Sequence, residues 1–421
     1  MFAVLKNNPE FRKLWLSQVV SSAGDWFNRM ALLALIGDLG GPSFGQGLGA
    51  LFAVEIALRL LPTALFSTVA GPIADRLSRR GVMITTDLLR AGIVLGFLLV
   101  DEANELPLLY GLLFAQMSVG IFFDAARSAS VPNTIPPEDL HDAYTLSAAT
   151  WSMMLALGAA LGGLLLTIVG LAGVFILDAA TYLVSAAFVV WLRLPPTPRA
   201  EEPLTWKDVL LVRDLRRAVR HLRERGALPF TLAKCFWGAC GGFIVMLSIT
   251  GKVRFGPLFG EEAAAAGLAT SLLYMARGVG TGIGPVLSRR IFGQSDRGLL
   301  RQIFTGYLVG AIGYAFFAPL ESLPLALLML VLAHCGGSAL WVGSTTGWQS
   351  KIHDSFRGRA FSVEFLLLTV SFTIGALGTG ALYDRTTSIE LSIWVACAAV
   401  VLGSLVWRAL AERILRQAEP A

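Results

Sequence analysis

The chain is poor in charged residues. Asp, Glu, Lys and Arg make up 15% of its 421 residues, whereas an ordinary soluble domain has about 25%. Hydrophobic residues reach 55%, and the mean hydropathy is +0.66. A soluble protein could not bury so much apolar surface, but a bilayer solvates it, because each spanning helix needs about 20 mostly apolar residues. The composition therefore predicts a membrane protein.

Residues that carry catalysis or bind metals are also scarce. The four cysteines lie in apolar segments without a Cys-x-x-Cys pair, which disfavours a disulfide framework or a zinc site. The four histidines are scattered, and no G-x-x-x-x-G-K-[ST] loop is present, which disfavours an ATP-driven pump. The N-terminus lacks a cleavable signal pattern, so we expect the first helix to be retained. We expect a protein that is not an enzyme and binds no cofactor.

Twelve apolar segments of spanning length form two sets of six. The first set covers residues 12–38, 46–71, 81–100, 106–129, 143–168 and 171–193. The second set covers residues 228–253, 263–288, 299–318, 323–349, 358–382 and 389–411. This pattern predicts an all-α membrane protein with twelve transmembrane helices in two pseudo-symmetric bundles, residues 1–194 and 227–421, joined by a linker over 195–226.

The basic residues are concentrated in every second loop, and hence on one side of the membrane. Lys and Arg are frequent in one set of loops, and the opposite loops hold only Lys252, Arg254 and Arg385. Basic loops stay in the cytoplasm, so we expect both termini to be cytoplasmic. This asymmetry explains the net charge of +5 without a nucleic-acid partner.

The linker and an internal repeat support a two-part organisation. The linker opens with three prolines and continues as an arginine-rich amphipathic helix, which would lie on the cytoplasmic leaflet or stay solvated. Ala143-Tyr144 recurs as Ala360-Phe361, and the glycine run from Gly158 recurs as the run from Gly375. The number of residues between the two copies is the same in both cases. Two related halves around a central site are typical of transporters.

The strongest motif is Gly-Pro-Ile-Ala-Asp-Arg-Leu-Ser-Arg-Arg over residues 71–80, between the second and third helices. Its glycine permits close helix contact, and its aspartate can bond free N–H groups at a helix start. It resembles the signature loop of the major facilitator superfamily, G-x-x-x-D-R-x-G-R-R, with Ser78 in place of the second glycine. The resemblance implies the major facilitator fold and a cytoplasmic gate formed by Gly71, Asp75, Arg76, Arg79 and Arg80, with Arg127 as an ion-pair partner.

Further stretches narrow the resemblance. Residues 87–90, 124–127, 178–182 and 357–362 are similar to the bacterial branch of macrolide-efflux and enterobactin-exporter proteins. The run over residues 158–163 resembles the antiporter motif G-P-x-x-G-G, with Ala159 in place of proline. This motif implies export by exchange, and its residues Gly158, Gly162 and Gly163 form a packing face in any case.

Several ionisable groups interrupt the apolar segments, where they are costly unless they face a cavity or a partner. Asp25 is our first candidate for proton coupling, because the first helix lines the central cavity in the resembled family, and Glu55 is the second. Each acid could instead pair permanently with the arginine four residues later. The proton-coupling or substrate candidates are Asp25, Asn28, Arg29, Glu55, Arg59, Arg277 and His334.

Aromatic residues could add an apolar pocket for a solute. The candidates are Trp26, Trp237, Tyr274 and Trp341. We therefore expect a monomeric bacterial inner-membrane exporter, surrounded by lipid, that exchanges protons for a small hydrophobic or amphipathic molecule such as a drug or siderophore.

Two alternatives stay open. A ferroportin-like exporter of divalent metals would use Asp25, Cys240 and His334, because thiolate and imidazole ligands suit transition metals. A lysophospholipid flippase is the other alternative, since the first helix is also similar to that group around Gly24 and Asp25.

Overall fold

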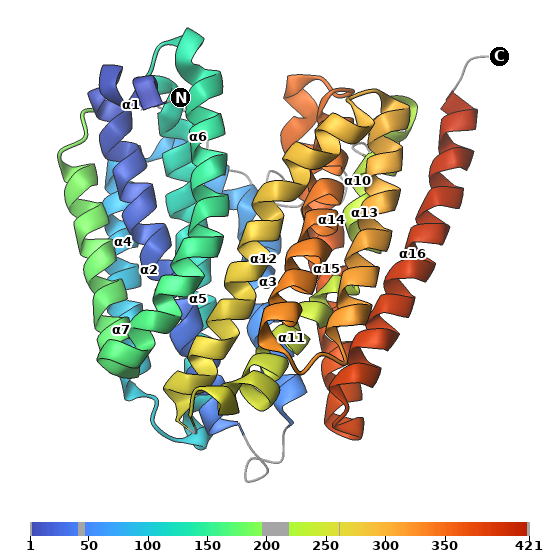
Figure 1. The fold of residues 1–421 in the computed structure, drawn as a ribbon. Coiled ribbons are helices and arrows are strands. Elements are labelled where there is room, and N and C mark those ends of the chain that lie inside the picture. The colour runs from blue at the N-terminus through green and yellow to red at the C-terminus, as the bar shows by residue number, and fades with distance from the viewer. Residues whose placement is uncertain (1, 41–46, 196–218, 261, 419–421) are drawn as a thin grey trace. The chain divides into compact units, whose positions relative to one another are not determined.

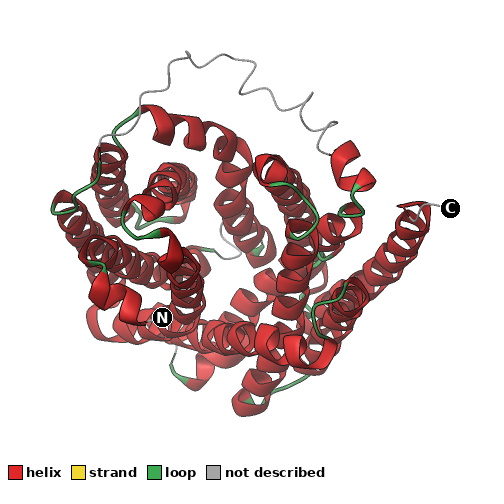
Figure 2. Cartoon of the chain, turned by 90° about the horizontal axis from the view of Figure 1, so that it is seen from above, coloured by secondary structure: helices red, strands yellow, loops and turns green. Residues whose placement is uncertain are grey.

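The computed structural model describes the whole chain except residues 1, 41–46, 196–218, 261 and 419–421. Side chains at 2–3, 67–68, 71–72, 74–75, 141, 148, 354–359 and 416–418 are likewise not described. Within the described residues the protein is almost entirely helical and has no strand (Figures 1 and 2). Most of the predicted linker lies outside the described residues.

The N-terminal part contains seven α-helices among its described residues. They are α1 (Phe2–Asn7), α2 (Pro9–Leu39), α3 (Leu48–Arg76), α4 (Arg79–Gly96), α5 (Leu106–Ser130), α6 (Leu140–Met153) and α7 (Ala159–Val190). A π-helical turn, Met154–Gly158, joins α6 to α7. Short 3-10 turns lie at Phe97–Leu99, Ala103–Glu105, Val131–Asn133 and Pro137–Asp139.

The C-terminal part contains seven further α-helices among its described residues. They are α10 (Leu228–Phe236), α11 (Cys240–Thr250), α12 (Ala263–Phe292), α13 (Asp296–Phe317), α14 (Leu323–Gln349), α15 (Asp354–Thr386) and α16 (Ile389–Ala418). A π-helical turn, Gly251–Phe255, and a 3-10 turn, Gly256–Leu258, follow α11.

These helices confirm the predicted twelve-span fold, with interruptions that have local causes. Gly170 has φ of +70°, a conformation that favours glycine, and it divides α7 between the predicted fifth and sixth spans. The seventh span is broken between α10 and α11, where Gly238 and Gly241 lie against the α15 backbone. A Cβ on Gly241 would lie 2.0 Å from the carbonyl oxygen of Phe372.

Hydropathy alone identifies fewer spans than the fold contains. By length and composition, eight described helical stretches could cross a membrane, one of them Pro137–Val190, which holds two predicted spans. Helices α2, α12 and α13 are absent from this set, and α2 and α12 carry charged residues inside the predicted spans, among them Asp25 and Arg277.

The chain forms two compact units. Unit 1 comprises Met1–Gly40, Leu58–Val209 and Leu258–Ser271, and unit 2 comprises Gly41–Ala57, Leu210–Pro257 and Leu272–Ala421. Helices α3 and α12 each contribute residues to both units. In unit 1, α2 packs along α7, and α4 packs against α5 and α7. Large apolar side chains such as Leu99 and Ile168 are exposed, as expected of surfaces that face lipid.

An acid near the end of α15 caps the start of α3 within unit 2. Asp384 accepts hydrogen bonds from the backbone N–H groups of Gly49 (2.8 Å) and Ala50 (2.9 Å). A carboxylate at this position satisfies free N–H groups and opposes the positive end of the helix dipole. The backbones also touch, because a Cβ on Gly49 would lie 2.1 Å from the carbonyl oxygen of Gly380.

We predict that Asp384→Ala destabilises the protein by about 1 kcal/mol, since the α3 start loses a charged cap. Thermal unfolding of purified protein in detergent measures this effect. Arg385→Ala, which changes an exposed neighbour, is the matched control and should leave the unfolding midpoint unchanged. Equal midpoints for the two variants would contradict the capping role.

Candidate functional site

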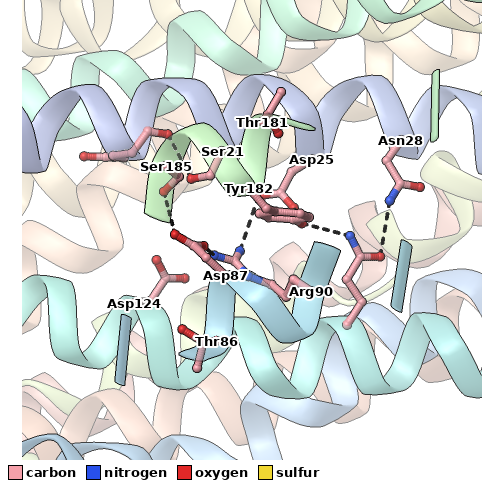
Figure 3. A network of polar contacts seen from close by, with 12 residues as sticks. Ser21, Asp25, Asn28, Thr86, Asp87, Arg90, Asp124, Thr181, Tyr182 and Ser185 are labelled. Carbon is pink, nitrogen blue, oxygen red and sulfur yellow. Dashed lines mark hydrogen bonds and ion pairs between the residues drawn. The ribbon is translucent and has the colours of Figure 1, made fainter. Parts of the chain in front are cut away.

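A buried polar network lies among four helices of unit 1 (Figure 3). Side chains spaced three or four residues apart share one face of a helix, and this spacing places two or more network residues on each of three helices. The network consists of Asp25 and Asn28 on α2, Asp87 and Arg90 on α4, Gln116 on α5, and Asp178, Tyr182 and Ser185 on α7.

Arg90 links the helices of this network. Its guanidinium donates to Asp87 Oδ1 at 2.5 Å and lies 4.0 Å from Asp25 Oδ2. It also lies over the rings of Tyr182 (4.3 Å) and Phe123 (4.6 Å), as in cation–π pairs. Ser185 donates a further bond to Asp87, at 2.7 Å. A buried charge is tolerated only with partners of this kind.

Asp25 is the accessible carboxylate of the network. Its side chain is 35% exposed, whereas those of Arg90 and Asp87 are 6% and 0% exposed. Tyr182 donates its hydroxyl to Asp25 Oδ1 at 2.5 Å. Asp25 therefore joins a surface that water or a solute can reach to a buried set of polar groups.

Two of the predicted charges on the first two spans, Asp25 and Arg59, have partners on other elements. The salt bridge of Asp25 is formed with Arg90 rather than with Arg29, whose guanidinium lies 5.3 Å from the Trp26 ring centroid. Glu55 is buried in the part of α3 that belongs to unit 2. Arg59 contacts the Met117 sulfur at 3.7 Å in unit 1. Only Asp25 and Asn28 of these candidates belong to the network.

Most of the predicted gate residues lie where α3 ends and α4 begins. The side chains of Gly71 and Asp75 are not described, and Arg76 is partly buried. Arg79 donates to the carbonyl of Ala129 at 2.7 Å, and Arg80 donates to the carbonyl of Val190. Arg127, the predicted ion-pair partner of the loop, donates a hydrogen bond to Gln18 Oε1 at 2.9 Å. Its Nε atom lies 3.9 Å from Asp124 Oδ1.

The predicted glycine face permits close contacts of its helices in unit 1. A Cβ on Gly158 would lie 2.9 Å from Trp26, and one on Gly162 would lie 3.0 Å from the Phe27 backbone. A Cβ on Gly163 would lie 2.3 Å from Ser271 of α12. These glycines let α2 and α7 approach closely enough for their polar side chains to meet.

The candidates of the C-terminal half lie in an aromatic part of unit 2. His334 Nε2 is 2.9 Å from the Tyr314 hydroxyl, and both side chains are buried. The Arg277 guanidinium lies 5.5 Å from the ring centroid of Tyr274. Trp237 is buried beside Tyr307 and Phe243.

No metal centre is formed by the described residues. No group of three or more His, Cys, Asp or Glu side chains is placed to hold an ion in that part of the chain. Cys240 is buried on α11, and His334 is engaged by Tyr314.

A second buried ion pair was missed in the sequence. Lys234 on α10 lies 3.0 Å from Glu364 on α15, and these side chains are 3% and 1% exposed. Glu364 also accepts bonds from Ser344 and from Trp348, both on α14. Lys234 lies 4.1 Å from the ring centroid of the predicted Trp341.

The signal for the missed residues was present in the sequence. Lys234 and Glu364 lie within predicted apolar spans, where a charge by itself indicates a partner or a function. Asp87, Arg90 and Asp178 lie in motifs that we used only for the resemblance to a family. Spacing along one helix could not show which of these residues meet.

The fold and these buried polar groups define a polytopic membrane protein of the transporter class. The sequence pattern of the Major Facilitator Superfamily matches residues 14–376. The chain belongs to the major facilitator superfamily.

Some relatives within this family are exporters by name. The chain is 27% identical to a putative bacilysin exporter of Bacillus amyloliquefaciens over 374 residues, 88% of each protein. It is 24% identical to macrolide efflux protein A of Streptococcus pyogenes over 221 residues, 52% of each. A crystal structure of a POT peptide transporter with sulfate has the same fold, with a TM-score of 0.75, 14% identity, and coverage of 97% of this chain and 95% of that one.

We predict that Glu364→Leu or Lys234→Met alone destabilises the protein by about 3–5 kcal/mol, because either change leaves a buried group without its partner. The double variant Lys234→Met/Glu364→Leu should recover most of the loss. Thermal unfolding in detergent measures this double-mutant cycle. The exposed pair of Lys351 and Asp296 provides the control, since Asp296→Asn should cost less than about 1 kcal/mol. Additive losses in the buried pair would contradict direct coupling.

Proposed function

We propose that this protein is a secondary active exporter of a small hydrophobic or amphipathic molecule, driven by proton antiport. The named relatives support export, because a bacilysin exporter and a macrolide efflux protein are similar to this chain. The single observation that carries proton coupling is Asp25, a partly exposed carboxylate bonded to a buried network of acids and one arginine.

Proton coupling follows from the two environments that Asp25 can experience. Contact with Arg90 and Tyr182 stabilises the ionised carboxylate, and separation from them within an apolar medium favours the protonated form. A carboxylate whose surroundings alternate takes up a proton on one side of the membrane and releases it on the other. Solute binding near Asp25 would compete with that proton, so export and proton entry alternate.

The remaining candidates have supporting roles in this proposal. The bundles over residues 1–194 and 227–421 would alternate around a central site. The arginines Arg76, Arg79, Arg80 and Arg127, with Gly71 and Asp75, would close the cytoplasmic side. Trp26, Trp237, Tyr274 and Trp341 would contact the apolar part of the solute. We propose a lipid-surrounded monomer in the bacterial inner membrane with cytoplasmic termini.

The test uses proteoliposomes with an interior pH dye and an imposed pH gradient. Macrolides, cationic dyes, catecholate siderophores, lysolipids and divalent metals are added in turn. We expect a macrolide, dye or siderophore to drive proton flux in the wild type, and Asp25→Asn to abolish that flux while solute binding persists, because its side chain cannot ionise.

Asp38→Asn is the matched control, since Asp38 is an exposed carboxylate on the same helix, and its flux should equal that of the wild type. Transport without proton movement, or normal flux in Asp25→Asn, would disprove the assignment of Asp25. Flux driven only by metals or only by lysolipids would replace the proposed solute class.

A further inference from the structure

A continuous chain of hydrogen bonds joins Asp25 to a second, fully buried carboxylate. Tyr182 donates to Asp25 at 2.5 Å, and Gln116 Nε2 donates to the Tyr182 hydroxyl at 3.0 Å. Asn28 Nδ2 donates both to Gln116 Oε1 (3.4 Å) and to Asp178 Oδ2 (2.7 Å). The chain therefore begins at one carboxylate, Asp25, and ends at another, Asp178.

Asp178 has neutral partners only. It is 0% exposed, and its side chain accepts bonds from Asn28 and, at 3.3 Å, from Thr181. Among the described residues no cation lies within 4.0 Å of it. A Cβ on Gly24 would lie 2.3 Å from Asp178 Oδ1, so the α2 backbone covers the carboxylate. Burying an ionised carboxylate without a cation is costly, and such a group is neutralised by binding a proton.

The charges around Asp178 do not offset its own. Asp25 on α2 and Asp87 on α4 are acids, and Arg90 is the nearby cation, already committed to those two acids. Asp124 on α5 is 74% exposed and lies beside Arg127. One guanidinium thus serves two of these three buried or partly buried carboxylates and leaves Asp178 without a cation in contact, so at least one of the three gains by accepting a proton.

The donor-to-acceptor direction of the hydrogen bonds links the protonation states of the two carboxylates. As drawn, Asn28 donates toward both ends through its two N–H groups, and both carboxylates act as acceptors, which suits their ionised forms. The oxygen of an asparagine side chain has two lone pairs. If the Asn28 and Gln116 amides turn over and the Tyr182 hydroxyl rotates, every bond reverses. The reversed chain requires Asp25 and Asp178 to be donors, and hence both to be protonated.

We propose that Asp178 is a second proton-binding carboxyl, and that the Tyr182–Gln116–Asn28 chain makes it gain and lose its proton together with Asp25. Two O–H bonds form with protons from the extracellular water, and the same two bonds break to release these protons to the cytoplasm. The exporter then exchanges two protons in each cycle. This inference rests on the proposed function of Asp25 in proton antiport.

Infrared spectroscopy of the purified protein tests proton binding without any solute. The absorption of protonated carboxyl groups is followed through a pH titration in the wild type, Asp178→Asn and Asp101→Asn, the last being an exposed control. We expect Asp178→Asn to remove a titrating buried carboxyl and to make the remaining transition shallower. Gln116→Leu interrupts the hydrogen-bond chain. This variant should keep both titrating carboxyls, and its titration should also be shallower than that of the wild type. An unchanged buried-carboxyl signal in Asp178→Asn would overturn the proposal.

The proton stoichiometry tests coupling. Proteoliposomes with the membrane potential clamped at zero are given erythromycin, or the compound of the panel that the wild type transports. The concentration ratio of the compound across the membrane should change about a hundredfold per unit of pH gradient in the wild type and about tenfold in Asp178→Asn. Each exchanged proton contributes one factor of ten to this ratio. Equal slopes would overturn the coupling role of Asp178.

Failure of the two proposals gives different results. If Asp25 does not couple protons, either no solute moves protons in the wild type or Asp25→Asn keeps the wild-type flux, while the infrared titration still decides whether Asp178 binds a proton. If Asp178→Asn does not fold, Asn28→Ala serves instead. It removes a donor to the Asp178 carboxylate, so the buried-carboxyl signal should persist to higher pH. An unshifted signal in Asn28→Ala would contradict the proposal.

Discussion

The need to pair charges that are buried away from water dominates unit 1. Arg90 carries this constraint, because its guanidinium on α4 contacts Asp87 and lies near Asp25 and Tyr182 of two other helices. The loss of one partner from a buried pair leaves a charge that the interior does not solvate. The relative positions of α2, α4 and α7 therefore depend on one side chain as well as on apolar packing.

Close packing of helices makes these polar contacts possible. Gly24, Gly158 and Gly162 lie where a side-chain carbon would collide with a neighbouring helix. Membrane helices gain no hydrophobic stabilisation from leaving lipid, so they associate through close contacts at small residues and through hydrogen bonds. In this protein the close packing and the hydrogen bonds depend on each other, since the polar side chains of α2 reach Asp178 and Tyr182 only where the glycines let α2 and α7 approach closely.

The two units compensate their buried charges in different ways. In unit 2, Lys234 and Glu364 balance each other, and three further polar groups bond to the pair. In unit 1, Asp25 and Asp87 share Arg90, and the buried Asp178 has no cation in contact among the described residues. Opposite charges in a buried pair compensate each other, whereas an excess of buried acid is relieved by proton uptake. This contrast explains why we assign proton exchange to the N-terminal half, although the repeat suggests that the halves have a common origin.

The sequence by itself determined the twelve spans and the family, because a span is a local property of about 20 consecutive residues and the signature loop is contiguous. It also indicated Asp25 and Asn28 as unusual groups within a span. It could not indicate their partners, since Asp25 pairs with Arg90 on α4 rather than with Arg29 four residues away. The chain from Asp25 to Asp178 crosses three helices, so only tertiary packing decides which side chains meet and which carboxylate lacks a cation.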